Sequence, residues 1–207
     1  MTLFRTFIRL APALLAASMM LILASRSSAA NPEVFTQGLI DQGVAILADK
    51  SGGVKARNER FRDFLLKYAD TRTSALFTLG SYRRGASEAD LNDFVDAFKD
   101  YATAVYEKRL EQYAGQTLKV TGSTKNKDGD FTVNAVEAGN NPQPLKVAFR
   151  LMGQEGNYRF VDVNVAGVWL SIEQRDQFAS FLGANGGKIP ALSANLRQQA
   201  SNIRAGG

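Results

Sequence analysis

The chain has 207 residues, of which 45% are hydrophobic, 22% charged and 10% aromatic, and its formal charge is +5. This is the composition of an ordinary globular protein, not of a disordered, collagen-like or wholly membrane-embedded one. Because the chain contains neither cysteine nor histidine, Ser-His and Cys-His nucleophiles, thiol redox chemistry and the usual structural zinc sites are excluded.

The first 30 residues have the pattern of a signal peptide. Arg5 and Arg9 precede an apolar run over residues 10–24, and small residues follow at positions 28–30. We expect cleavage before Asn31, export to a bacterial periplasm, and one domain over residues 31–207; an uncleaved anchor is the alternative. Removing Arg5, Arg9 and Arg26 lowers the formal charge from +5 to +2, which argues against a nucleic-acid partner.

Apolar residues at helical spacing predict a mostly helical region up to Gly115. The expected helices cover residues 34–48, 55–69, 71–79 and 87–113. Ser87 with Asp90 has the form of a capping box, and Gly115 is expected to cap the end of the long helix. Ser171 with Gln174 predicts a second capping box and a helix to residue 181, and a last helix follows Gly186 and Gly187.

Between residues 116 and 166 the apolar period changes to two. Four runs alternate apolar and polar residues and are separated by Gly- and Asn-rich turns, which predicts an antiparallel meander. One face of this sheet is apolar and the other carries Lys119, Thr132, Arg150 and Asp162. We therefore predict an α+β fold in which a layer of helices covers one face of a four-stranded antiparallel sheet.

Motifs for chemistry are absent or incomplete. Gly80 and Gly85 have phosphate-loop spacing, but Ala86-Ser87 stands where a Lys-Ser/Thr pair is needed. Asp90, Asp93 and Asp96 repeat along the long helix without a second source of ligands. We predict no catalytic residue, no metal site and no cofactor. The aromatic residues on the helical stripes fit either a packed core or the wall of an apolar cavity.

Two segments resemble the MlaC family of periplasmic phospholipid-binding proteins, also called the toluene-tolerance or Mla family. The first is Leu79-Gly80-Ser81-Tyr82-Arg83-Arg84-Gly85 running on through Phe94, Tyr101 and Tyr113, and the second is Val161-Asp162-Val163-Asn164-Val165-Ala166-Gly167-Val168-Trp169 with Arg175 to Phe178. The element order is similar over the whole mature chain. A hopanoid-associated branch of the same superfamily has similar segments, and Trp169 departs from the residue expected in the transport branch.

The resemblance implies a monomeric carrier that shuttles phospholipid between an outer-membrane lipoprotein complex and an inner-membrane ABC transporter, maintaining lipid asymmetry. The alternative is a hopanoid-associated lipid-binding protein. We expect the lipid tails to lie between the helices and the apolar sheet face, and Arg83 or Arg84 to attract the headgroup phosphate. The expected wall residues are Phe64, Tyr68, Leu76, Leu79, Phe94, Phe98, Tyr101, Val105, Phe131, Val133, Val147, Phe149, Val161, Val163, Val165 and Val168.

Two hypotheses from other classes remain open at this point. A carboxylate enzyme acting on lipid or envelope polymer would have a polar cleft with an essential Asp or Glu. A non-catalytic envelope interaction module would have a filled interior and an exposed apolar patch.

Overall fold

The computed structural model describes residues 31–110, 115–139, 141–154 and 157–206. The helices are α1 (Pro32–Ala48), α2 (Gly53–Tyr68), α3 (Thr71–Thr78), the short 3-10 helix η1 (Gly80–Arg83), α4 (Glu88–Leu110), α5 (Leu170–Ala184) and α6 (Ile189–Arg204). The strands are β1 (Leu118–Lys127), β2 (Asp130–Glu137), β3 (Lys146–Gln154), β4 (Asn157–Val165) and β5 (Val168–Trp169). The predicted α+β class is confirmed. The predicted signal peptide and Tyr113 lie outside the described residues.

The sheet is an antiparallel meander in the order β1-β2-β3-β4-β5. The prediction of four strands missed β5, which has two residues and pairs with the end of β4. Register brings Val133, Phe149 and Val163 side by side on one face, and Thr132, Arg150 and Asp162 on the other. The apolar face and the polar face therefore follow from the alternation in the sequence.

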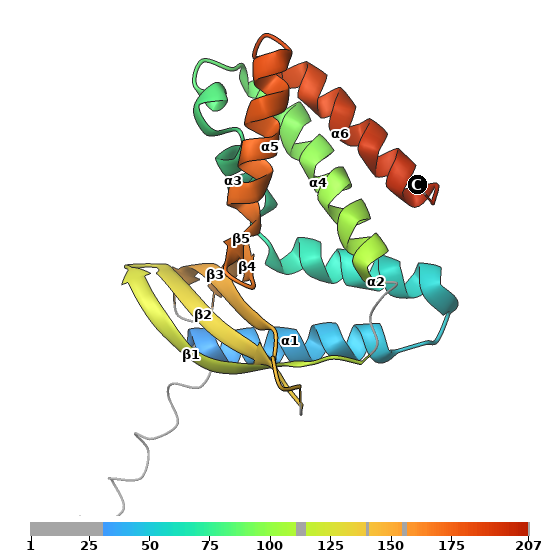
Figure 1. The fold of residues 1–207 in the computed structure, drawn as a ribbon, viewed down its shortest axis with the longest axis vertical. Helices are drawn as coiled ribbons and strands as arrows, with labels where there is room; N and C mark the ends of the chain where they lie inside the picture. The colour runs from blue at the N-terminus through green and yellow to red at the C-terminus, as the bar shows by residue number, and fades with distance from the viewer. Residues whose placement is uncertain (1–30, 111–114, 140, 155–156, 207) are drawn as a thin grey trace, which may run out of the picture.

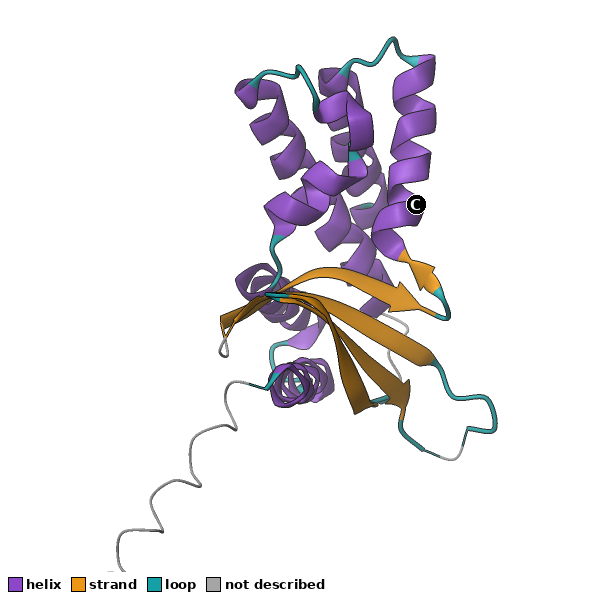
Figure 2. Ribbon diagram, turned by 90° about the vertical axis from the view of Figure 1, so that its left-hand side faces the viewer, coloured by secondary structure: helices purple, strands orange, loops and turns teal. Residues whose placement is uncertain are grey.

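Helix α1 lies along the apolar side of the sheet, as Figure 2 shows. Its Phe35 ring contacts Tyr158 of β4 at 5.3 Å between ring centroids. The Gln37 side chain binds the backbone of β1, donating to the carbonyl of Leu118 at 3.2 Å and accepting from the amide of Val120 at 2.8 Å. Because β1 is an edge strand, these bonds satisfy backbone groups that would otherwise lack a partner strand.

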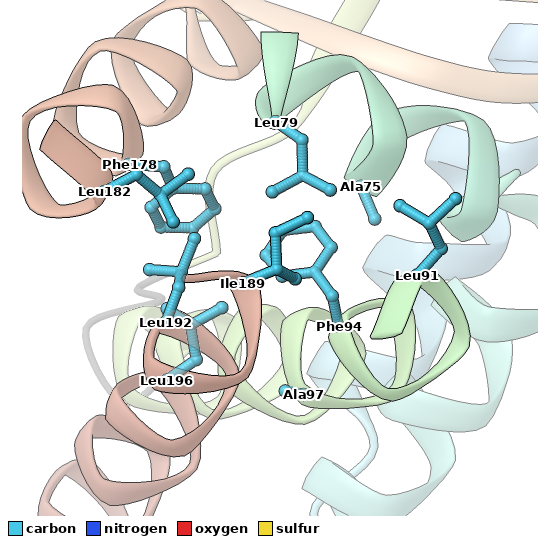
Figure 3. Close-up of a cluster of buried hydrophobic side chains, with 10 residues drawn as sticks. All are labelled: Ala75, Leu79, Leu91, Phe94, Ala97, Phe178, Leu182, Ile189, Leu192 and Leu196. Carbon is cyan, nitrogen blue, oxygen red and sulfur yellow. The ribbon is translucent and has the colours of Figure 1, made fainter. Parts of the chain in front are cut away.

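The other long helices form a second layer with a core of its own (Figures 1 and 3). This helical core combines Ala75 and Leu79 near the end of α3 with residues of α4, α5 and α6; the remaining members are Leu91, Phe94, Ala97, Phe178, Leu182, Ile189, Leu192 and Leu196. A smaller sheet core consists of Val133, Leu151 and Tyr158, with Phe35 packed against it. Among the described residues the buried apolar side chains thus form two clusters, one in the helical layer and one between α1 and the sheet.

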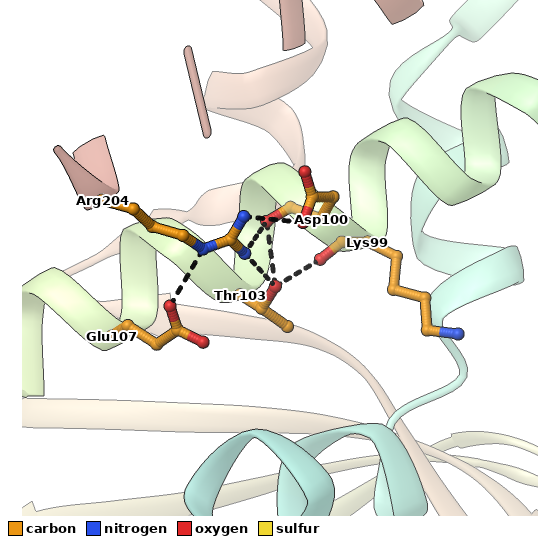
Figure 4. A network of polar contacts seen from close by, with 5 residues as sticks. All are labelled: Lys99, Asp100, Thr103, Glu107 and Arg204. Carbon is orange, nitrogen blue, oxygen red and sulfur yellow. Dashed lines mark hydrogen bonds and ion pairs between the residues drawn. The ribbon is translucent and has the colours of Figure 1, made fainter. Parts of the chain in front are cut away.

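Polar contacts hold α6 along α4. Arg204 donates to Asp100 Oδ1 at 2.8 Å and to Glu107 Oε2 at 3.3 Å, as Figure 4 shows. Further along the same helices, Arg197 forms an ion pair with Asp93 at 2.5 Å. These pairs are partly exposed, so each adds little to stability, but they fix how α6 lies on α4.

The two layers are joined near β4. The backbone amide of Asp70 donates to the carbonyl of Phe160 at 2.7 Å, and the Ser74 hydroxyl donates to the carbonyl of Val161 at 2.7 Å. The residue Asp162 binds Ser171 at the start of α5. The prediction of a Ser171–Gln174 capping box was wrong, because α5 already begins at Leu170 and Ser171 lies within its first turn. The Ser87–Asp90 cap is present, with Asp90 N donating to Ser87 Oγ at 3.1 Å.

Candidate functional site

A continuous series of aromatic rings connects α2, α1 and the sheet. On α2 the centroids of Phe61 and Phe64 are 5.9 Å apart, and those of Phe64 and Tyr68 are 5.2 Å apart. Tyr68 then contacts Phe35 of α1 at 6.4 Å. From Phe35 the contacts continue into the sheet through Tyr158 and Phe160 to Phe131 and Phe149. These eight residues are called the aromatic series below.

The aromatic series is only partly covered by protein. Tyr158 is buried, with 5% of its surface exposed, whereas the other seven rings are half-buried. Helix α2 has 16 residues and none of them is buried, although it carries Phe61, Phe64 and Tyr68. Large apolar side chains normally lie in the core of a globular domain. A helix that keeps them half-covered offers free apolar surface beside the sheet.

Helix α4 brings a second set of half-buried apolar residues towards α2. Phe98, Tyr101 and Val105 follow one another at helical spacing on α4, and one end of α4 approaches α2 in Figure 1. Phe98 also contacts Phe178 at 6.3 Å, so this part of α4 adjoins the helical core. The two helices contact each other, and both carry half-buried apolar residues.

The sixteen predicted wall residues fall into three groups. Ten are half-buried: Phe64, Tyr68, Leu76, Phe98, Tyr101, Val105, Phe131, Phe149, Val163 and Val165. Five are buried, with no more than 9% of their surface exposed: Leu79, Phe94, Val133, Val147 and Val161. Val168 is exposed at 50% on β5. The five buried residues offer no surface to a ligand in this conformation, whereas the half-buried group and Val168 do.

Arg83 and Arg84 lie at the opposite end of the helical layer. Both are exposed: Arg83 ends η1 and Arg84 follows it, before α4, in the green segment at the upper left of Figure 1. An open recess of about 560 Å³ lies beside them and is lined by Tyr82, Arg84 and Lys188, among others. The structure therefore does not bring the two predicted headgroup arginines together with the aromatic series.

The sequence prediction missed Phe35, Phe61, Tyr158 and Phe160 as site residues. A β-bulge explains Phe160: Arg150 pairs with Asp162 but Leu151 pairs with Phe160, so Val161 is an extra residue in β4. Strict alternation from Val163 would place Phe160 on the polar face. Phe35 had a detectable signal, because it precedes Leu39 by four residues and so lies on the same side of α1.

Neither a metal-binding cluster nor a membrane-spanning helix occurs among the described residues. No cluster of three or more Asp or Glu side chains among them could hold a metal ion. None of the described helices has the length and apolar character needed to cross a bilayer. What the arrangement around α2 offers chemically is apolar surface.

Comparison with known proteins gives two findings. The family model described as "MlaC protein" matches residues 37–198. A solved structure, that of a phospholipid-binding protein from Ralstonia solanacearum in complex with a phospholipid, has a similar fold with a TM-score of 0.72. The two sequences are 21% identical, and the match covers 84% of this chain and 99% of the other. At that identity the structural match establishes a shared fold.

Proposed function

The chain belongs to the MlaC family, and from this we propose that it is a periplasmic phospholipid-binding protein that carries lipid and catalyses no reaction. Its fold is shared with a protein whose structure holds a phospholipid. Cargo binding of this kind needs apolar surface and no covalent chemistry, so the absence of cysteine and histidine is compatible with it.

The half-buried state of the aromatic series is the observation that carries this proposal. Moving one 16-carbon chain from a bilayer into water costs roughly 12 kcal/mol, so a free phospholipid does not cross an aqueous compartment at a useful rate. A carrier must replace the apolar surroundings of the tails. The rings on α2, α1 and the sheet, together with Phe98 and Tyr101 of α4, supply such surroundings between the two layers.

The carrier role extends to a shuttle between two membranes. We propose that the chain collects and delivers lipid at an outer-membrane lipoprotein complex and an inner-membrane ABC transporter. Separate cores in the two layers favour this, because the layers can change their relative position without unpacking either core. A partner complex that binds the more open arrangement would shift the population towards it and release the tails.

A lipid-transfer assay tests the carrier role. Two vesicle populations are separated by a porous filter that lets the protein through and holds the vesicles back. The mature chain should speed the exchange of a labelled phospholipid between them. Phe149→Asp places a charge on the half-buried sheet face and should reduce the transfer rate at least tenfold, because a carboxylate is costly beside acyl chains.

Phe77→Asp is the matched control, since Phe77 is exposed at 38% on α3 and lies over Arg175, outside the aromatic series. It should leave transfer unchanged. Circular dichroism and a thermal melt would establish that both variants are folded. If Phe149→Asp does not fold, Phe149→Ala replaces it in the transfer assay. Wild-type protein that transfers no lipid would contradict the proposal.

A further inference from the structure

Two neighbouring residues of α2 hold buried polar atoms without partners. In the described part of the chain, three buried side-chain atoms lack a hydrogen-bond partner, and two of them are Arg57 Nε and Asn58 Oδ1. They are consecutive residues on the one long helix that has no buried residue. An unsatisfied buried donor or acceptor is costly and calls for an explanation.

Arg57 shares a helix face with the aromatic residues of α2. Phe61, Phe64 and Tyr68 follow it by four, seven and eleven residues, which is the spacing of one stripe along a helix. The eleven-residue separation between Arg57 and Tyr68 corresponds to about 16 Å along the axis. One leaflet of a bilayer has a hydrocarbon depth of about 15 Å. The stripe therefore has a cationic end and an apolar body with the dimensions of one lipid leaflet.

We propose that Arg57 binds the phosphate of the phospholipid, with Asn58 beside it, while the acyl chains lie along Phe61, Phe64 and Tyr68. This inference rests on the proposed function. A phosphoryl oxygen is a strong acceptor for a guanidinium group, and the bond is stronger when water is excluded from it. The Asn58 side-chain oxygen can accept a hydrogen bond from a headgroup hydroxyl. In the flipped amide orientation, the Asn58 NH2 group can instead donate to an ester oxygen.

The other cations of α2 do not meet these conditions. Arg60 forms an ion pair with Asp49 at 3.0 Å and donates to the carbonyl of Ser51 at 3.2 Å. Lys55, Arg62 and Lys67 are exposed. Arg57 combines partial burial with an unpartnered donor, and it lies with the aromatic series, whereas Arg83 and Arg84 lie at the far end of the helical layer.

The test compares a phospholipid with a diacylglycerol that has the same acyl chains and no phosphate. Each lipid displaces a fluorescent fatty acid from the mature chain, and the apparent Kd is measured for the wild type, Arg57→Met and Arg62→Met. We expect Arg57→Met to weaken phospholipid binding about tenfold and to leave diacylglycerol binding unchanged. Arg62→Met, the matched control on the same helix, should change neither. Arg57→Gln provides the same comparison if the Met variant does not fold.

The possible outcomes separate this inference from the function itself. Equal phospholipid affinity in the wild type and Arg57→Met would overturn it, and so would an equal loss for both lipids, which would indicate a structural role. Displacement of phospholipid from the wild type by millimolar inorganic phosphate would assign the site to free phosphate and also overturn it. A wild type that binds neither lipid would contradict the proposed function.

Discussion

Asp162 of β4 binds both the backbone amide and the side-chain hydroxyl of Ser171 in the first turn of α5. Trp169, which precedes α5, makes no side-chain cap for this helix. The carboxylate therefore satisfies helix N-terminal groups from a different element. This side chain is one of the contacts that join the sheet to the helical layer, beside those of Asp70 and Ser74.

Removing this link should destabilise the protein. We expect Asp162→Ala to lower the free energy of unfolding by about 2 kcal/mol and Ser171→Ala to lower it by about 1 kcal/mol, since each removes a capping interaction. In urea titrations the double variant should lose less unfolding free energy than the sum of the two single losses, because the two side chains bind each other. Strictly additive losses would show that the two side chains do not interact.

Acid should weaken the sheet through Asp130. This carboxyl group is 1% exposed, and Arg150 donates to both of its oxygens, at 3.1 and 2.7 Å. These hydrogen bonds hold the pKa of Asp130 below its usual value of 3.8, and burial opposes them. Arg197 likewise lowers the pKa of Asp93. A carboxyl group whose pKa is lower in the folded than in the unfolded state binds a proton more readily when the chain is unfolded, so acid favours unfolding.

It follows that this contribution to the free energy of unfolding is constant above about pH 5 and falls as the pH drops through 4 and below. Asp130→Asn should cost about 2 kcal/mol at pH 7, because it leaves Arg150 without its charged partner. The variant should also show a shallower loss between pH 5 and pH 3. Parallel pH profiles for the variant and the wild type would contradict this role of Asp130.

The turn between β4 and β5 offers a stabilising substitution. Ala166 has φ +51, the left-handed region that a side chain disfavours, and is followed by Gly167 at φ +93. Ala166→Gly should raise the free energy of unfolding by about 0.5 to 1 kcal/mol, because glycine adopts this conformation without a steric penalty. The control is Ala194→Gly in the exposed part of α6, which should lower it by about 1 kcal/mol. Opposite signs for the same chemical change distinguish the turn from the helix.

Local patterns in the sequence predict the elements well, because their causes are local. Apolar spacing at Leu39 and Leu47 and the Asp128-Gly129 turn each act over a few residues, and the corresponding helix and hairpin are present. The α5 cap was mispredicted because its partner, Asp162, lies on another element. The residues next to Ser171 in the sequence give no sign of that contact.

The candidate binding site is harder to predict, because the spacing of apolar residues along an element does not show how much of each side chain is covered by other residues. Phe94 and Phe98 occur on the same stripe of α4, yet Phe94 is fully buried and Phe98 is half-buried. Whether a ring faces a core or free apolar surface depends on how the two layers sit, which is a tertiary property. The bulge at Val161, which moves Phe160 to the apolar face, is equally invisible to a strict two-residue period.

Native mass spectrometry of the mature chain, purified from a periplasmic extract without detergent, tests the carrier role most directly. We expect a species heavier than the polypeptide by the mass of one phospholipid, identified by fragmentation, and we expect Phe149→Asp to lack this species and Phe77→Asp to keep it. A wild-type chain that carries only its own polypeptide mass, and stays so after incubation with phospholipid vesicles, would contradict the carrier role.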